Sequence, residues 1–313
     1  MKRIILDTDP GVDDALAFLL AFSSPELKVE AVTTVDGNVS QEKGHRNAKQ
    51  LLEFLERTDV PVSMGAKKLL LREMNDASEF HGKTGLMDAN LPDPKMQSDP
   101  RNASKLILDY VDEFGKDLTL VAIGPLTNIA SAIILEPKLP QMIGGLVIMG
   151  GAFGLTPYGF GNANPVAEFN IWHDPEAAKI VFDSGMHVVC AALDTTTHPE
   201  YKMSKKMFQS CKAYGTRRSS LIGDLCGTLV DRYDSFSLHD PMAVTYVIDP
   251  TMFKTEKYHV DIETAGEYTM GMTVIDRRRG AQERRSESHH EIIMSVDASR
   301  FHKMFMERVV GGV

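Results

Sequence analysis

Four aspartates stand close together near the start of the chain, at Asp7, Asp9, Asp13 and Asp14. Four carboxylates this close repel one another, and without a counter-charge some of them must stay protonated. A hard cation removes the conflict, and an all-oxygen ligand set suits Ca²⁺ or Mg²⁺ better than Zn²⁺. The alternative is that Asp13 only caps a helix and that water solvates the other three. Because a cap needs one acid and not four, the pattern favours a metal site.

The residues around these acids predict how they are held. The apolar run Arg3–Leu6 predicts a buried strand, and Leu16–Phe22 predicts a helix. Pro10-Gly11 between them is typical of a turn, because Pro fixes φ and Gly tolerates any backbone angle. The acids therefore lie at the carboxyl end of the first strand and in the first turn of the helix. In open α/β sheets this crevice is where ligands bind.

Two more segments follow predicted strands and offer polar groups to the same crevice. Asn38 ends the run Val35-Asp36-Gly37-Asn38, where an amide can orient a water or a sugar hydroxyl. Ile123 precedes the turn Gly124-Pro125, which can aim its backbone carbonyl at a cation. Each segment is equally compatible with an ordinary turn, so neither decides the chemistry alone.

Glu168 and Asn170 are two residues apart and both point into the crevice if the chain there is extended. A carboxylate and an amide together suit polyol recognition, since they accept from and donate to hydroxyl groups. Asn162, in the glycine-rich segment upstream, adds a possible hydroxyl contact. The alternative is a polar strand edge without a ligand.

His239 and Asp240 form the third informative pair. Asp240 is a candidate cation ligand, and His239 is a candidate proton donor because an ordinary histidine titrates near neutral pH. A His-Asp pair at a helix start is more often structural, and His81 in the Leu69–Arg101 connection is more often a surface residue.

Apolar strand-like runs alternate with helical patterns along the whole chain. Strands are predicted at Leu27–Val35, Val60–Met64, Leu118–Ile123, Leu146–Met149, His187–Leu193, Tyr258–Ile262, Met272–Ile275 and Glu291–Val296. Helices are predicted at Gln41–Arg57, Leu126–Leu135, Pro175–Asp183 and Ala298–Val309. This alternation predicts an α/β fold, a Rossmann-like, mostly parallel open sheet flanked by helices. We expect one large domain, 1–313, with two long connections, Leu69–Arg101 and Ala152–Trp172, that are long enough to be functional.

Composition excludes several classes of protein. The 313 residues carry a net charge of −9, which argues against nucleic acid or an anionic membrane as the main partner. The basic run Arg277–Arg279 with Arg284 and Arg285 has acidic neighbours and predicts a solvated loop. There is no bilayer-spanning apolar run and no signal-peptide pattern. The three widely spaced cysteines predict reduced thiols and a cytoplasmic protein.

Taken together, six motifs resemble those of the nucleoside hydrolases, in the inosine–uridine-preferring branch with its pyrimidine-preferring relatives. The motifs are Asp7–Ala15 (DTDPGVDDA), Val35–Asn38, Gly124–Asn128, Met149–Gly151, Ala167–Asn170 and His239–Pro241. The resemblance spans nearly the whole chain in order. It implies the nucleoside hydrolase fold, a homotetramer or homodimer, and hydrolysis of purine or pyrimidine ribonucleosides to ribose and free base by a Ca²⁺-bound water.

The resemblance also implies roles for individual residues. Metal ligands would be the side chains of Asp9, Asp14 and Asp240 and the carbonyl of Ile123, and Asp9 would also be the general base. The substrate-binding residues would be Asp13, Asn38, His81, Met149, Asn162, Glu168 and Asn170. Asp13 and Asn170 would hold the 2′-hydroxyl, Glu168 and Asn162 the 5′-hydroxyl, and His239 would be the acid toward the leaving base. Asp7 would support the cluster from behind.

Two other interpretations fit part of the pattern. A haloacid-dehalogenase-like phosphatase also begins with a strand and Asp-x-Asp, but it leaves Glu168, Asn170 and His239 without a role. A non-catalytic Ca²⁺-dependent nucleoside- or sugar-binding protein would keep the cation and hydroxyl ligands and need no general base or acid.

Overall fold

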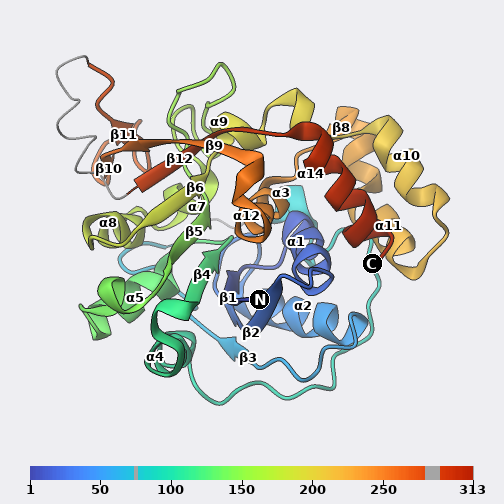
Figure 1. Cartoon of the computed structure of the whole chain (residues 1–313), viewed down its shortest axis with the longest axis horizontal. Helices are drawn as coiled ribbons and strands as arrows, with labels where there is room; N and C mark the ends of the chain where they lie inside the picture. The colour runs from blue at the N-terminus through green and yellow to red at the C-terminus, as the bar shows by residue number, and fades with distance from the viewer. Residues whose placement is uncertain (74–76, 279–289, 313) are drawn as a thin grey trace.

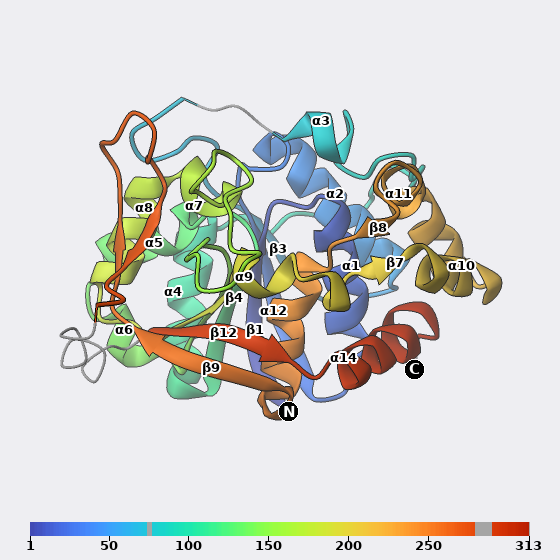
Figure 2. The ribbon, with the colours of Figure 1, turned by 90° about the horizontal axis from the view of Figure 1, so that it is seen from above.

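The computed structural model of the chain describes residues 1–73, 77–278 and 290–312. Its main strands are β1 (Lys2–Thr8), β2 (Leu27–Thr34), β3 (Val62–Met64), β4 (Leu118–Ala122), β5 (Gly145–Met149), β6 (Val188–Ala191), β9 (Phe253–Tyr258) and β12 (His290–Val296). Within the described residues these eight strands form one sheet in the order β3-β2-β1-β4-β5-β6-β12-β9 (Figure 1). Every neighbouring pair is parallel except β12 and β9, which run antiparallel side by side (Figure 2). The predicted class, a mostly parallel sheet, is confirmed.

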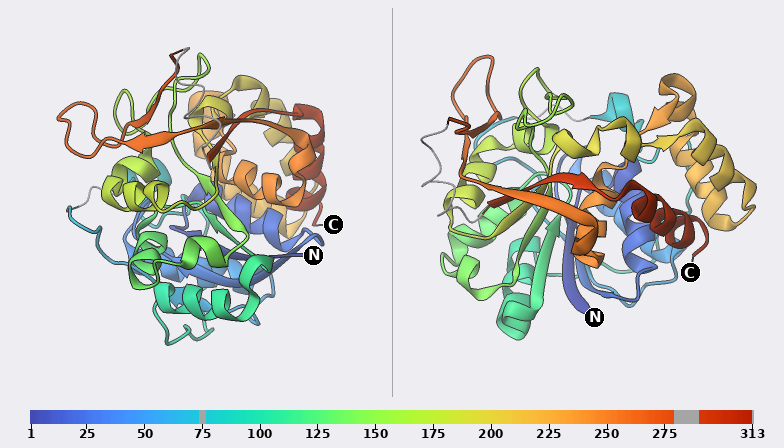
Figure 3. Two further views of the ribbon diagram at one scale, coloured as in Figure 1. Left: turned by 60° about the vertical axis from the view of Figure 1, so that its left-hand side comes forward. Right: turned by 45° about the horizontal axis from the view of Figure 1, so that its top comes forward.

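Helices cover both faces of this sheet. The longer ones are α1 (Val12–Phe22), α2 (Gln41–Phe54), α4 (Ala103–Phe114), α5 (Thr127–Leu135), α8 (Pro175–Asp183), α10 (Lys205–Ala213), α11 (Arg217–Tyr233), α12 (His239–Ile248) and α14 (Ala298–Phe305). Helices α1, α2, α11, α12 and α14 pack into one apolar core, and α4, α5 and α8 into the other. The two layers lie on opposite sides of the sheet (Figure 3, right).

Shorter elements complete the described chain. The short helices are α3 (Ser78–His81), α6 (Leu139–Met142), α7 (Phe169–His173) and α9 (Leu193–Thr196). The 3-10 helices are η1 (Gly115–Asp117), η2 (Pro199–Tyr201) and η3 (Pro250–Met252), and a π-helix, η5, spans Met306–Val310. Two antiparallel ribbons pair β7 (Met203–Ser204) with β8 (Ser235–Phe236), and β10 (Val260–Ile262) with β11 (Thr273–Ile275).

The first strand, β1, lies where the order of the strands along the sheet reverses. Side chains of a strand alternate between faces, so Ile4 and Leu6 enter one core and Ile5 enters the other. The chain passes from β1 to β2 and β3 on one side, and then returns to β4 on the other side of β1. The crevice between the carboxyl ends of β1 and β4 is therefore the switch point at which open α/β sheets bind ligands.

Several predicted boundaries differ from the structure. The predicted strand Tyr258–Ile262 is two elements, because β9 ends at Tyr258 and the chain turns before β10. The predicted closing helix, Ala298–Val309, is α-helical only as far as Phe305, and the residues after it form the π-helix. Among the longer helices, α4, α10 and α11 were not predicted, and only the start of α12 was; the short helices were not predicted either. Arg279, Arg284 and Arg285 of the predicted basic loop lie outside the described residues.

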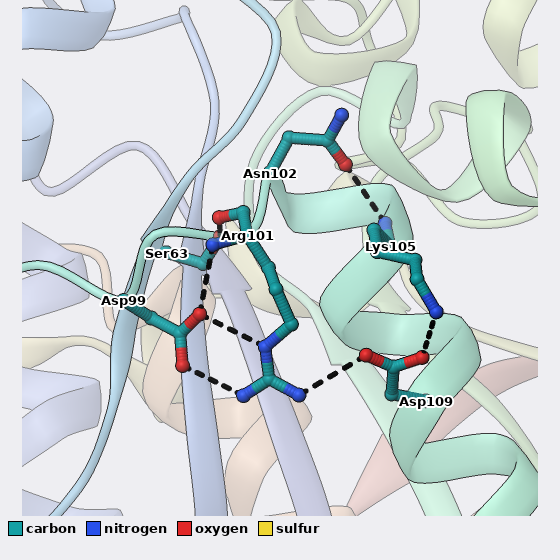
Figure 4. A network of polar contacts seen from close by, with 6 residues as sticks. All are labelled: Ser63, Asp99, Arg101, Asn102, Lys105 and Asp109. Carbon is teal, nitrogen blue, oxygen red and sulfur yellow. Dashed lines mark hydrogen bonds and ion pairs between the residues drawn. The ribbon is translucent and has the colours of Figure 1, made fainter.

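The long connection between β3 and α4 is fastened where it returns to the sheet (Figure 4). The Arg101 guanidinium donates to both carboxylate oxygens of Asp99, at 2.9 and 2.6 Å, and contacts Asp109 of α4 at 3.2 Å. The Ser63 hydroxyl of β3 donates to the Arg101 carbonyl at 2.5 Å. These contacts anchor one end of the segment that carries His81 to the sheet.

In the described stretches, no helix is both long enough and apolar enough to cross a bilayer.

Candidate active site

The turn between β1 and α1 buries all four aspartates predicted to act together. Asp7, Asp9 and Asp14 have no exposed surface, and Asp13 is 8% exposed. Gly11 N–H donates to Asp14 Oδ2 at 2.9 Å, and the Thr8 hydroxyl donates to Asp14 Oδ1. These local bonds close the turn and fix the direction of the Asp14 side chain.

Gly11 is required by the close approach of two other segments. A Cβ atom at this position would lie 2.5 Å from His81 Nδ1 and 2.8 Å from Asn38 Nδ2. A larger residue would therefore push both side chains away from the start of α1. The glycine of the turn brings three distant parts of the chain into contact.

Three carboxylates meet at the base of the site. Ligand oxygens of Asp13, Asp14 and Asp240 all lie within 4.8 Å of one another, although Asp240 comes from the first turn of α12. Burial is the largest cause that raises their pKa values, and mutual repulsion adds to it for Asp13 and Asp240. The pKa of Asp13 rises to about 8. Such a cluster stores electrostatic repulsion that a bound cation would relieve.

Asp9 lies beside this cluster and has one unsatisfied oxygen. Its Oδ2 accepts from the Asn38 backbone N–H at 2.6 Å, and its Oδ1 is buried without a hydrogen-bond partner among the described residues. An ionised carboxylate oxygen left unpaired in the interior is costly. Burial and the charges of Asp14 and Asp13 raise the pKa of Asp9 well above its ordinary value.

Support for the acids comes from behind the first strand. Asp7 Oδ1 accepts from the Thr33 hydroxyl and from Asn128 Nδ2, the latter at 2.7 Å. Asn128 also donates to the Thr34 carbonyl at 3.1 Å. Asn128, in α5 and at the end of the motif Gly124–Asn128, therefore links α5 to β1 and β2 by hydrogen bonds.

The acidic cluster opens into a cavity of about 550 Å³. Ten of the predicted site residues line it: Asp13, Asn38, His81, Ile123, Met149, Asn162, Glu168, Asn170, His239 and Asp240. Asp9 and Asp14 are not among the residues that line it. The volume is typical of a site for a small organic ligand.

One wall of the cavity is built by α7, where the sequence predicted an extended segment. Glu168 is the N-cap of α7, and its carboxylate accepts from the backbone N–H groups of Asn170 and Ile171 at 2.9 and 3.1 Å. Glu168 and Asn170 both reach the cavity, but from the start of a helix and not from an extended segment. Asn170 Nδ2 donates to the carbonyls of Ile123 and Met149, at 3.2 and 3.1 Å.

Glu168 and Asn162 complete this wall. Burial raises the pKa of Glu168 to about 7, although backbone donors oppose the shift. Asn162 Oδ1 accepts from the Phe169 N–H at 2.8 Å, so its Nδ2 stays available. The wall thus presents a carboxyl group and an amide donor side by side.

Two histidines face the cavity from different elements, His81 buried and His239 partly buried. His81 Nδ1 accepts from the Val12 N–H at 3.1 Å, and His239 Nδ1 is 2.7 Å from the Thr196 hydroxyl. Burial lowers the pKa of His81 to about 3 and that of His239 to about 4, and the charge of Lys202 adds to the second shift. Both imidazoles are therefore neutral at neutral pH. The backbone donor places the proton of neutral His81 on Nε2.

The sequence did not single out several other residues of the cavity. These are Ala77, Phe80, Phe169, Lys202, Tyr233, Ser235, Phe236 and Ser237. Most of them lie in, or directly next to, α3 and the β7–β8 ribbon. Neither element has a periodic pattern long enough to be detected.

Comparison with known proteins places the chain in a family. The model of the inosine-uridine preferring nucleoside hydrolases matches residues 4–303. A pyrimidine-specific ribonucleoside hydrolase, RihA of Enterobacter sp. (strain 638), is 41% identical over 280 residues, which are 87% of each chain.

Solved structures agree with the sequence relatives. A plant nucleoside hydrolase, the PpNRh1 enzyme, superimposes with a TM-score of 0.91 at 30% identity and covers 99% of both chains. A purine-preferring ribonucleoside hydrolase from Gardnerella vaginalis gives a TM-score of 0.89 at 32% identity, over 99% of this chain and 98% of that one. The chain belongs to the inosine-uridine preferring nucleoside hydrolase family.

Proposed function

We propose that this protein hydrolyses the N-glycosidic bond of ribonucleosides, giving ribose and free base, and that it does so with Ca²⁺. The observation that carries the proposal is the buried cluster of Asp13, Asp14 and Asp240 at the base of a cavity that also holds polyol-binding groups and two histidines. Family membership supports the reaction, while the identity of the cation rests on the residues themselves.

The residues present fit a hard cation. Asp9, Asp14 and Asp240 would hold it through carboxylates and Ile123 through its carbonyl, an all-oxygen set that Ca²⁺ prefers. The buried, unpartnered Oδ1 of Asp9 supports this assignment. Ile123 O already accepts from Asn170, and its second lone pair remains free for a cation. When bound, a cation of this kind makes water more acidic and orients vicinal hydroxyl groups.

Asp9 is the proposed general base. Its carboxylate is held by the Asn38 N–H, next to the acids that would carry the cation. A cation there would offset the repulsion that now raises the pKa of Asp9, so the group would be ionised and able to accept a proton from the attacking water.

The cavity wall is proposed to hold the ribose. Asp13 and Asn170 would bind the 2′-hydroxyl, Asn38 would help to orient water and sugar, and Glu168 and Asn162, beside Met149, would bind the 5′-hydroxyl. Fixing the sugar in this way favours attack at its anomeric carbon because the reacting atoms are already aligned.

His239 is the proposed acid toward the leaving base, with His81 on the same side of the cavity. Because burial keeps both rings neutral, neither acts as an imidazolium ion at neutral pH. With the Thr196 hydroxyl donating to Nδ1, neutral His239 would carry its proton on Nε2 and donate it in a hydrogen bond to the base as negative charge develops there. A preorganised donor of this kind stabilises the charge that develops in the transition state.

The proposal is tested by incubating the Ca²⁺-loaded protein with uridine, inosine and a sugar phosphate, and by measuring reducing sugar and phosphate separately. We expect reducing sugar from the nucleosides and no phosphate. Release of phosphate would support the phosphatase alternative. Uridine binding by equilibrium dialysis without any sugar release would support the binding-protein alternative.

We also propose a cytoplasmic homodimer or homotetramer. Cys190, Cys211 and Cys226 are all buried free thiols, which fits a reducing compartment. Large apolar side chains of Ile134 and Leu135 are exposed at the end of α5 and would suit a contact between subunits. Light scattering on a size-exclusion column measures the oligomeric state, and a monomer at all concentrations would contradict this part.

A further inference from the structure

Lys202 brings a positive charge to the end of the cavity that holds the histidines. It precedes β7, where Met203 pairs with Phe236, and the register continued by one residue sets Lys202 opposite Ser237. Both residues line the cavity with His239.

No protein group neutralises this cation in the part of the chain that the structure describes. The Lys202 ammonium forms neither an ion pair nor a hydrogen bond there, although the side chain is half-buried. Lys205, three residues further on, contacts Asp231 and Asp234 at 3.6 and 3.7 Å. Among the cavity-lining residues Lys202 is the only lysine or arginine. The position of Lys202 fits a ligand that places a hydrogen-bond acceptor beside the ammonium group.

The proposed reaction indicates which part of the nucleoside would contact Lys202. The ribose belongs at the acidic cluster, so the base extends toward His81, His239 and Lys202. An ammonium group has three donors and no acceptor. Uracil and hypoxanthine present an exocyclic carbonyl oxygen at the position where cytosine and adenine present an amino group. A carbonyl accepts from Lys202, whereas an amino group faces it donor to donor.

We propose that Lys202 selects nucleosides whose base carries a carbonyl at this exocyclic position, that is, 4-oxopyrimidines and 6-oxopurines over their amino counterparts. The inference rests on the proposed function, because it takes the orientation of the nucleoside from it. The Ser237 hydroxyl beside Lys202 can donate or accept and therefore favours neither class.

The test compares kcat/KM for uridine with cytidine, and for inosine with adenosine, in the wild type and in Lys202→Met. A charge-assisted hydrogen bond predicts a wild-type preference of about ten- to hundredfold for the carbonyl base. Lys202→Met should bring both ratios to within about threefold of unity, mainly by slowing uridine and inosine. Lys202→Arg keeps the donors and should retain the preference. Lys206→Met, at an exposed position of α10, is the matched control and should change neither ratio.

Equilibrium binding separates this inference from the proposed function. If the wild type binds uridine more tightly than cytidine, and Lys202→Met does not, the selection stands even where no bond is cleaved. The proposal is overturned if the wild type binds uridine and cytidine equally well, or if Lys202→Met weakens the binding of both by the same factor. It is also overturned if uridine 5′-phosphate binds more tightly than uridine and only the variant loses that advantage, because Lys202 would then bind a phosphate.

Discussion

Replacing Asp240 by Asn distinguishes two effects of the acidic cluster: repulsion that destabilises the cation-free protein, and binding of a cation that stabilises it. The substitution keeps the shape of the side chain and removes one of the three charges that lie within 4.8 Å of one another. At this separation, and with an effective dielectric constant of about 20, two full charges repel by about 3 kcal/mol. Because the acids are partly protonated in the cation-free protein, we expect Asp240→Asn to stabilise that form by about 1–3 kcal/mol at pH 8.

The size of this gain depends on pH. Burial and repulsion raise the folded-state pKa of these acids above the ordinary value of 3.8, so the unfolded chain loses its protons at lower pH. Cation-free stability therefore falls as pH rises through the window from 3.8 to about 8, the folded-state pKa of Asp13. The gain from Asp240→Asn should be present at pH 8 and should disappear near pH 4.

The assay is urea unfolding of wild type and variant in chelator and in Ca²⁺. At a concentration one hundred times the dissociation constant, Ca²⁺ adds about 2.7 kcal/mol to the wild type. The variant lacks one ligand and should gain much less at the same concentration. Asp112→Asn, at an exposed position of α4, is the control and should respond as the wild type does. The reasoning is refuted if Asp240→Asn destabilises the chelated protein at pH 8, or if Ca²⁺ stabilises both proteins equally.

Three further predictions concern turnover. Asp9→Asn should stay folded and lose about 10²-fold or more in kcat, the scale of a lost general base; a variant within a few-fold of wild type would remove Asp9 from that role. Uridine should be hydrolysed far faster than 2′-deoxyuridine, because Asp13 and Asn170 would lose their partner; comparable kcat/KM for the two would overturn that assignment. His239→Ala should slow a natural nucleoside far more than a nitrophenyl riboside, whose leaving group needs no proton; equal losses in kcat would show that His239 is not the leaving-group acid.

Much of the site was predictable because it depends on local chemistry. The strand, the Pro10-Gly11 turn and the helix follow from neighbouring residues, and parallel strands bring their carboxyl ends to one edge. Asp13, Asn38 and Ile123 therefore meet in the structure as the sequence indicated. The mutual arrangement of the metal ligands and their roles stay predictions.

The remaining features depend on contacts that local patterns do not contain. Glu168 caps α7 through two backbone N–H groups, so its segment is helical where a two-residue alternation suggested a strand. Lys202 reaches the cavity only because two-residue strands, β7 and β8, pair although residues 205–234 separate them in the sequence. The neutral state of His239 comes from burial by several distant elements, which no spacing along the chain reports.

The most direct test of the proposed function is the stoichiometry of products under metal control. Uridine is incubated with the chelated protein and with protein reloaded with Ca²⁺ or Zn²⁺, and uracil and ribose are quantified by chromatography. We predict equimolar uracil and ribose with Ca²⁺, little with Zn²⁺, and none after complete chelation. Full activity in a preparation shown to be metal-free by elemental analysis would contradict the cation's role. Folded, Ca²⁺-loaded protein that releases no base from uridine or inosine would contradict the function itself.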